Sequence, residues 1–437
     1  MKAVSWKSWK WTVACMAALS LVLSACSASS GNETEAGTGT DAAPQTSGKD
    51  EVVELNVINF RVEDTAFYDE INKKFQEAYP NIRLRYDAVP TKDYAQLRTA
   101  RLTTGDLDLF ASGGEVELKD PDLRAIMYDL KDQPFLGNFY PDALKAGQYE
   151  GAQYFLPMNT TAMVTFYNKQ MFEEHGLAVP TTWDEFIAVC EALKAKGIDP
   201  IIFGGKDQWP VNMIIGELEK SLVRPGGTNQ DFYEKLKTEE TGFNDPRWVE
   251  VFAKLQQLSG YFQPNATGLD YGQAPGLFAQ GKAAMMIDGS WSLAQIEDAS
   301  PSFETGVFLL PGGNKPEDNG TAATKYGFGW YVNKDSENVD AAMKYLEFLT
   351  QKDNYQQYTN MVRMLPVMKD VVTESPIINE VDKLMEKQQS LWENTFMPGA
   401  AYQHTFYAME LIFGKIAPEE AAANMQKDFI QSKPNWK

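Results

Sequence analysis

The order of apolar and polar residues along the chain predicts alternating strands and helices. Strand-like stretches occupy residues 55–60, 82–86 and 107–111. Apolar residues spaced by four positions predict an amphipathic helix over residues 67–79, which ends at Pro80. A second helix is expected around residues 94–102. This βαβαβ order is typical of a mostly parallel sheet covered by helices, and it places the chain in the α/β class.

A second unit with the same alternation begins near Ala162. Residues 164–167 are strand-like, and Thr182 and Glu185 have the spacing of a capping box that starts a helix ending at Gly197. Another short buried strand is expected at residues 200–203. Further helices are expected after Asn338, as an N-cap, and from Pro418, since proline is tolerated at the first helical position. Trp183, Trp248 and Cys190 lie in helical patterns, where core packing is the expected role.

The N-terminus has the features of an export signal. Three lysines precede an apolar run of roughly 13 residues, which is too short to span roughly 30 Å of hydrocarbon. The run ends in Leu23-Ser24-Ala25-Cys26, which resembles the bacterial lipobox, and the alternative is an ordinary signal peptide with an accidental cysteine. We therefore expect a signal peptide over residues 1–25, lipidation at Cys26 and a flexible Ser/Gly/Thr/Ala-rich tether to residue 50.

Charge and composition exclude several function classes. The full chain has a net charge of −20, and without the three signal-peptide lysines it has 37 basic and 60 acidic residues, a net charge of −23. Such a chain is repelled by nucleic acid and by anionic lipid headgroups. Only His175 and His404 are present, which excludes a three-histidine metal site. We expect no nucleic-acid partner, no metal and no cofactor.

Four passages carry a resemblance to a known family. They are residues 154–159 running into 166–169 and 180–186, residues 278–291, residues 327–332 and residues 414–422. In this order and behind a lipobox, they resemble the extracellular solute-binding proteins of bacterial ABC sugar importers, the maltose-binding-protein-like family. The resemblance covers residues 51–437.

The resemblance implies a two-lobe, periplasmic-binding-protein-like fold of type II, with three hinge crossings and a ligand cleft between the lobes. Carried onto this sequence, the crossings are expected near residues 162–166, 286–290 and 331–334. The N-lobe is then expected to contain residues 51–162 plus 289–331, and the C-lobe residues 165–287 plus 333–437. Closure of the lobes around a ligand is a known motion of such proteins.

Aromatic side chains are the main candidates for sugar contact, because flat rings suit the C–H faces of a sugar and fixed polar groups suit its hydroxyls. Trp209 lies in a polar, glycine-bearing loop after a strand end, where open α/β sheets bind ligands. Trp291 lies directly after one of the predicted crossings between the lobes. Asp288 is expected either to accept sugar hydroxyls or to cap a helix. Tyr326 and Trp330 share one strand face, which is either hinge core or binding platform.

Five more polar or aromatic groups are candidates from their loop positions or from the resemblance, with surface or salt-bridge roles as the alternative. Phe60 and Arg61 end the first strand, Glu115 follows the third, Asn159 lies at the approach to the second lobe, and Arg363 precedes an apolar stretch. The complete predicted ligand-binding set is Phe60, Glu115, Asn159, Trp209, Asp288, Trp291, Tyr326, Trp330 and Arg363.

The sequence therefore predicts a monomeric, lipid-anchored receptor on the outer face of a bacterial, Gram-positive cell membrane, touching that membrane through its anchor only. It is expected to capture a sugar or oligosaccharide, deliver it to the transmembrane permease subunits of an ABC importer, and perform no chemistry. Two alternatives stay open: an extracellular glycoside hydrolase, for which two carboxylates suffice, and a ligand-sensing subunit for a membrane kinase.

Overall fold

The computed structural model describes residues 52–113, 117–118, 120–228, 231–387, 389–391 and 403–435. Residues 50–437 form one compact unit. The expected signal peptide, Cys26 and the tether lie outside the described residues. Within the described part, no helix is both long and apolar enough to cross a membrane.

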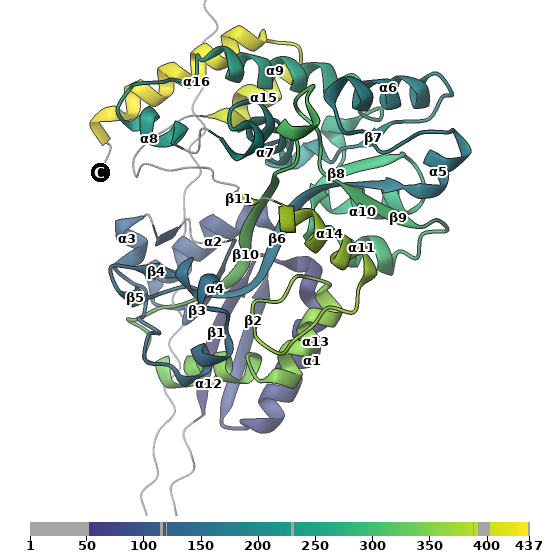
Figure 1. The fold of residues 1–437 in the computed structure, drawn as a ribbon. Coiled ribbons are helices and arrows are strands. Elements are labelled where there is room, and N and C mark those ends of the chain that lie inside the picture. Colours follow the sequence, from purple (N-terminus) through teal and green to yellow (C-terminus); the bar gives the residue numbers. More distant parts are fainter. Residues whose placement is uncertain are drawn as a thin grey trace, which may run out of the picture. The chain divides into compact units, whose positions relative to one another are not determined.

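The strands form one mixed sheet of nine strands and one small hairpin (Figure 1). The order in the large sheet is β2-β1-β3-β10-β6-β8-β7, with β11 beside β10 and β9 beside β6. The pairs β1–β2, β1–β3, β7–β8 and β10–β11 are parallel, whereas β6 and β10 pair antiparallel with each other. The strands are β1 (Val53–Asn59), β2 (Ile82–Ala88), β3 (Leu109–Ser112), β4 (Gln148–Tyr149), β5 (Ala152–Gln153), β6 (Leu156–Asn168), β7 (Ile201–Ile202), β8 (Met285–Gly289), β9 (Thr305–Phe308), β10 (Ala322–Val332) and β11 (Gln389–Leu391).

Helices cover the sheet, so the predicted α/β class is confirmed. The α-helices are α1 (Thr65–Ala78), α2 (Thr91–Thr104), α3 (Pro121–Arg124), α4 (Pro141–Lys145), α5 (Lys169–Glu174), α6 (Trp183–Lys194), α7 (Val211–Leu222), α8 (Phe232–Lys237), α9 (Pro246–Ser259), α10 (Ala274–Ala279), α11 (Leu293–Asp298), α12 (Val339–Leu349), α13 (Lys352–Val362), α14 (Pro376–Lys387), α15 (His404–Ile412) and α16 (Pro418–Ser432). Four 3₁₀ turns matter below: η1 (Val62–Asp64), η4 (Gly205–Asp207), η7 (Tyr271–Gln273) and η8 (Ser290–Ser292).

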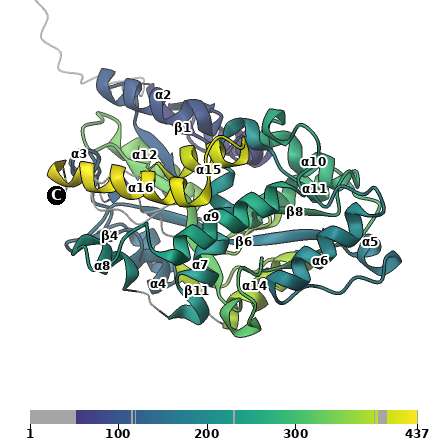
Figure 2. The same cartoon turned by 90° about the horizontal axis from the view of Figure 1, so that it is seen from above.

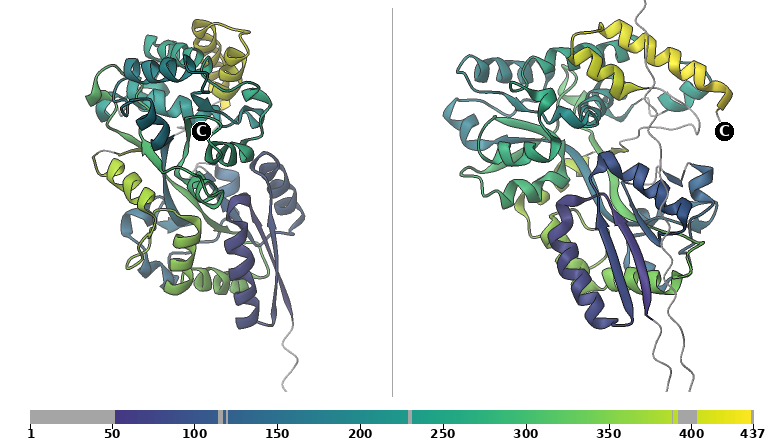
Figure 3. Two further views of the ribbon diagram at one scale, coloured as in Figure 1. Left: turned by 90° about the vertical axis from the view of Figure 1, so that its right-hand side faces the viewer. Right: turned by 180° about the vertical axis from the view of Figure 1, so that it is seen from behind.

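The N-lobe core combines the first strands with helices from much later in the chain. Helix α12 lies against β1, and α1 packs against both α12 and α13, although more than 250 residues separate α1 from these two helices in sequence (Figures 1 and 3). Buried side chains of all three helices, such as Phe75, Tyr345 and Tyr355, share one hydrophobic cluster. The expectation that the C-lobe takes all of residues 333–437 is therefore wrong for α12 and α13.

The C-lobe has two apolar clusters of its own. One is built from helices α6, α7, α9, α15 and α16, with α9 packed against both α7 and α16 (Figure 2). The other joins α10, α11 and α14 to β6 and β8. Helix α11 and strand β9 thus belong with the C-lobe, although residues 289–331 were expected in the N-lobe.

Three segments connect the lobes. Strand β6 passes from the N-lobe, where Leu156 pairs with β10, to the C-lobe, where Met163 to Tyr167 pair with β8. Strand β10 returns, and residues 363–375 lead from α13 to α14. The first crossing was predicted near residues 162–166, and β6 changes its partner from β10 to β8 between Ala162 and Met163. The second predicted crossing does not match, because β8 at 285–289 pairs within the C-lobe, and β10 crosses before rather than at residues 331–334.

Several local predictions are confirmed. The Thr182 hydroxyl accepts from the Glu185 backbone N–H, and the Glu185 carboxylate accepts from the Thr182 N–H, which completes the capping box. Trp183, Trp248 and Cys190 are buried in the C-lobe core, and burial raises the pKa of the Cys190 thiol to about 12. Asn338 occupies the N-cap of α12, but its side chain donates to the Glu54 carbonyl instead of capping the helix.

Candidate functional site

One cavity of about 510 Å³ is lined from both lobes and by the connecting strand β10. We call it the aromatic cavity. The N-lobe contributes the end of β1, η1, the start of α2 and the end of β3, and the C-lobe contributes the loops around η4, η7 and η8. Its rings are Phe60, Tyr94, Trp209, Tyr271 and Trp291. Its charged side chains are Arg61, Glu63, Lys92, Arg98, Glu117, Asp207, Asp270 and Lys325.

The N-lobe wall is positioned by strand ends and by ring packing. Phe60 follows directly after β1 and packs edge-on against Tyr94, with ring centroids 5.4 Å apart. The Tyr94 hydroxyl donates to the Ala111 carbonyl of β3 at 2.5 Å, which ties α2 to the sheet. The Phe60 ring also lies 6.0 Å from that of Phe328. This wall is therefore anchored to three strands of the N-lobe.

The C-lobe wall consists of three rings in mutual contact. The rings of Trp209 and Tyr271 pack edge-on with centroids 4.5 Å apart, and the Trp291 indole Nε1–H donates to the Tyr271 hydroxyl at 2.5 Å. Two glycines make this packing possible. A Cβ on Gly289 would lie 2.2 Å from the Trp291 ring, and a Cβ on Gly204 would lie 2.6 Å from the Tyr271 Cα. A side chain at either position would displace the wall.

Asp288 lies behind this wall and does not line the cavity. Its carboxylate is fully enclosed and accepts from the Tyr271 hydroxyl at 3.0 Å, the Gly289 N–H at 2.7 Å and the Ser292 hydroxyl at 2.9 Å. Burial raises the pKa of Asp288 to about 7, while these hydrogen bonds act in the opposite direction. The two predicted roles were sugar contact and helix capping. In the structure, the carboxylate instead accepts its hydrogen bonds from groups within the protein.

Most charges in the aromatic cavity are paired with an opposite charge of the protein. Arg61 is buried and forms two hydrogen bonds to Asp64, at 2.5 and 2.9 Å, while Arg98 contacts Glu117 at 2.9 Å. The Asp270 carboxylate lies 2.7 Å from Lys206. The Lys325 ammonium lies over the Trp291 ring at 5.8 Å. Because buried charges are costly unless paired, this pairing leaves a cavity that favours neutral polar ligands.

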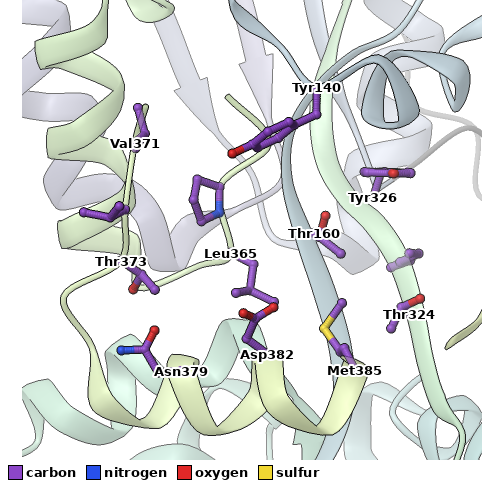
Figure 4. Close-up of a pocket in the computed structure, with 13 residues that line it drawn as sticks. Tyr140, Thr160, Thr324, Tyr326, Leu365, Val371, Thr373, Asn379, Asp382 and Met385 are labelled. Atoms are coloured by element: carbon purple, nitrogen blue, oxygen red, sulfur yellow. The ribbon is translucent and has the colours of Figure 1, made fainter. Parts of the chain in front are cut away.

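A second cavity, of about 490 Å³, lies against the same connecting strands (Figure 4). It is lined by Thr160 of β6, by Thr324 and Tyr326 of β10, by the 365–373 segment and by α14. Successive residues of a strand point to opposite faces, so Thr324 and Tyr326 line this cavity, whereas Lys325 and Gly327 line the aromatic cavity. The Lys325 side chain also borders the second cavity, so it lines both cavities.

Three predicted site residues line the aromatic cavity: Phe60, Trp209 and Trp291. Tyr326 lines the second cavity. Asp288 supports the aromatic cavity from behind. Glu115 lies outside the described residues.

Three other predicted residues lie elsewhere. Trp330 is fully buried in the N-lobe core, 5.9 Å from the Tyr68 ring, because this part of β10 faces α1 and α12. Asn159 is also fully buried, and its amide donates to the Tyr358 hydroxyl. Arg363 forms ion pairs with Glu297 at 2.5 Å and with Asp298 at 2.9 Å, and it lines neither cavity.

Two rings of the aromatic cavity, Tyr271 and Tyr94, were not predicted from the sequence. Tyr271 lies in Asp270-Tyr271-Gly272, a polar, glycine-bearing loop of the kind that singled out Trp209, so the same signal was available. Tyr94 lies in a helix with an otherwise polar exposed face, which gives no such signal. Among the described residues, no group of three or more histidine, cysteine, aspartate or glutamate side chains is arranged to hold a metal ion.

Comparison with known proteins gives consistent results. The model of the bacterial extracellular solute-binding protein family matches residues 60–356. The multiple sugar-binding protein of Streptococcus mutans is 27% identical over 322 residues, which are 71% of this chain and 74% of that protein. The maltotriose-binding protein of Pyrococcus abyssi is 26% identical over 74% of this chain and 68% of its own length.

Solved structures agree with the fold. A chitin oligosaccharide binding protein superposes with a TM-score of 0.78 at 23% identity and covers 88% of this chain and 100% of its own. The solute-binding protein RafE in complex with raffinose gives a TM-score of 0.75 at 21% identity, with 87% and 100% covered. The predicted type II periplasmic-binding-protein fold is thereby confirmed.

Proposed function

Because the chain belongs to the bacterial extracellular solute-binding proteins, we propose that its aromatic cavity captures a sugar or oligosaccharide for an ABC importer. The observation that carries this proposal is the meeting of five aromatic rings from both lobes in one cavity. Sugars present apolar C–H faces that can pack against such rings, and aromatic side chains contribute large apolar contact areas to binding. Relatives named for multiple sugars and for maltotriose support the same class of ligand.

The electrostatics of the cavity favour a neutral ligand. Arg61, Arg98 and Asp270 already have partners of opposite charge. Their polar atoms remain available to sugar hydroxyls without leaving an unpaired charge when the lobes close and exclude water. Preference of the ligand for the closed arrangement then shifts the population of the two arrangements, which the permease subunits distinguish.

The carboxylates of the cavity support binding without bond cleavage. Glycoside hydrolysis requires one carboxylic acid and one carboxylate placed on either side of the scissile bond. Here Glu63 lies 3.4 Å from Arg61, and Glu117 is held by Arg98 and Ser112. Asp270 is held by Lys206, and Asp207 accepts from the Tyr271 backbone N–H. These contacts assign the acids to structural tasks, so we propose a receptor and not an enzyme.

We further propose that Cys26 carries a lipid that anchors the protein outside a Gram-positive membrane, with residues 27–50 as a tether. A Cys26→Ser variant should then leave the membrane fraction and appear in the culture medium. Cys190→Ser is the matched control, since that thiol is buried in the C-lobe and should not affect membrane association. Retention of the Cys26→Ser protein on the membrane would contradict the anchor.

A thermal-shift screen tests the proposed ligand class. The purified protein is heated with maltotriose, raffinose, stachyose and chitin oligosaccharides, which are sugars named for relatives and similar structures. A ligand at 100 times its dissociation constant stabilises the folded state by about 2.7 kcal/mol, so a hit raises the melting temperature. Chromatography of the recovered sugar should show it intact. Cleaved sugar would favour the hydrolase.

A further inference from the structure

We propose that Asp288 is a positioning residue that fixes the C-lobe aromatic wall through the Tyr271 hydroxyl. This role deepens the proposed function, because the wall it fixes is the proposed sugar-binding surface. Asp288 lines neither cavity, so its effect on a ligand must pass through Tyr271 and Trp291.

The hydrogen bonds run in one direction from Trp291 to Asp288. An indole N–H is a donor only, so the Tyr271 oxygen must accept from Trp291. The Tyr271 proton is then directed at an acceptor, and two lie within reach: the Asp288 Oδ1 at 3.0 Å and the Ser292 Oγ at 3.2 Å. The carboxylate is the stronger acceptor of the two, because hydrogen bonds to an ionised group are stronger than neutral ones. An ionised carboxylate accepts only, so it is a suitable end for this chain. The Ser292 hydroxyl satisfies the other oxygen, Oδ2, at 2.9 Å.

The same chain reaches a third ring. Tyr271 packs edge-on against Trp209, and its backbone N–H donates to the Asp207 carboxylate at 2.9 Å. One enclosed carboxylate therefore acts on three rings that line the aromatic cavity. Loss of the Asp288 acceptor leaves the Tyr271 hydroxyl with the longer contact to the Ser292 hydroxyl, at 3.2 Å. The Trp291 indole then has a less firmly held partner.

The surroundings of Asp288 make this support dependent on pH near neutrality. Burial raises the pKa of the Asp288 carboxyl to about 7, and the negative charge of Glu63 on η1 adds to the rise. On the neighbouring β6, the residue opposite Asp288 is the apolar Val164. The other ionisable side chains that face this region are Tyr271 itself, Asp207 and Asp270 beside it, and Lys325 above the Trp291 ring. Below about pH 7 the protonated carboxyl is a weaker acceptor, and the wall loosens.

The test requires no ligand, so it fails or succeeds independently of the sugar screen. The indole N–H signals of the protein are recorded by NMR with ¹⁵N-labelled tryptophan, and the Trp291 signal is identified by its loss in Trp291→Phe. In the wild type, we expect slow exchange of this proton with solvent and a shift of its resonance with a midpoint near pH 7.

Three variants separate positioning from general damage. Tyr271→Phe keeps the ring but removes the link, and should speed exchange of the Trp291 indole proton at least tenfold. Asp288→Asn keeps an acceptor oxygen without a charge, so at every pH its indole exchange should match that of the wild type below pH 7, and the shift near pH 7 should be abolished. Asp298→Asn, an exposed aspartate of α11, is the control and should leave exchange at the wild-type rate.

Two results would overturn the proposal. One is an exchange rate in Tyr271→Phe equal to that of the wild type, which would show that the link does not hold the indole. The other is a midpoint near pH 7 that persists in Asp288→Asn, which would assign the titration to another group. Either result leaves the sugar proposal standing, whereas a sugar screen without hits leaves the wall measurement unaffected.

Discussion

The aromatic cavity and the second cavity have similar volumes and share strand β10, yet their walls differ in chemistry and in order. The C-lobe wall of the aromatic cavity holds three rings fixed by mutual contact and by a hydrogen-bonded chain to a buried carboxylate. The second cavity is lined by threonines and aliphatic side chains together with Tyr326, Asn379 and Asp382 (Figure 4). Two further lining residues, Tyr140 and Val372, are 48% and 65% exposed.

This difference indicates which face of the strand is built for a ligand. Rings held in place before binding lose little conformational freedom when a ligand arrives, and so more of the contact energy appears as affinity. Exposed side chains at a rim must be ordered first. We therefore expect the sugar to bind in the aromatic cavity. The second cavity is expected to change shape as the lobes move, without binding the sugar.

The largest expected effect is on the free energy of unfolding, and it distinguishes residues of β10 that face the core from those that face a cavity. Trp330→Ala removes a fully buried indole from the N-lobe core and should lower the free energy of unfolding by about 3–5 kcal/mol. Tyr326→Ala, four residues earlier on the rim of the second cavity, should cost far less. Chemical denaturation measures both. Equal losses in the two variants would contradict the assignment of Trp330 to the core.

The next effect concerns pH and the carboxylate behind the aromatic wall. The raised pKa means that folded Asp288 keeps its proton while the unfolded chain loses it near pH 3.9, so its contribution to stability falls between about pH 4 and pH 7 and is constant above. Relative to the wild type, Asp288→Asn should therefore gain roughly 2–4 kcal/mol in unfolding free energy between pH 4 and pH 8. Denaturation curves at several pH values test this, and a gap independent of pH would contradict it.

Loss of a ring from the aromatic wall should weaken binding without unfolding the protein. Trp209→Ala and Trp291→Ala are each expected to reduce affinity for the sugar identified in the screen by about 1–3 kcal/mol, the scale of a buried aromatic contact. Calorimetry measures the change, and circular dichroism checks the fold. Unchanged affinity in both variants would remove the aromatic cavity as the binding site.

The smallest expected effect is the change in sugar affinity caused by a substitution in the second cavity. Thr324→Ser alters a side chain that borders this cavity, on the same strand as Lys325 and Gly327 of the aromatic cavity. It should change sugar affinity by no more than about 0.5 kcal/mol, the usual range for substitutions away from a site. A larger loss by calorimetry would mean that the two faces of β10 are coupled or that the sugar binds here.

Sequence patterns predicted much of this architecture because the information was local. The strands and helices of the first 110 residues and the capping box at Thr182 follow from spacing, and Trp209 follows from its loop position. Trp291 was a candidate because of the family resemblance. Phe60 was a candidate because it ends the first strand, where the resembled family often places an aromatic ring.

The missed features depend on long-range packing. Whether Trp330 faces the core or a cavity is decided by which side of β10 receives α1 and α12, and no local pattern encodes that choice. The lobe assignment of residues 339–362 failed for the same reason, since these helices pack beside α1 across more than 250 residues of chain. Asp288 was predicted to contact the sugar or cap a helix, and its position behind the wall could not be predicted without knowing that Tyr271 lies against it.

A crystal structure with the sugar identified in the screen tests the central claim most directly. The account predicts sugar rings stacked on Trp209, Tyr271 or Trp291 in the aromatic cavity, with their hydroxyls on the paired charges of both lobes. Sugar density confined to the second cavity, or to a surface away from these rings, would contradict it.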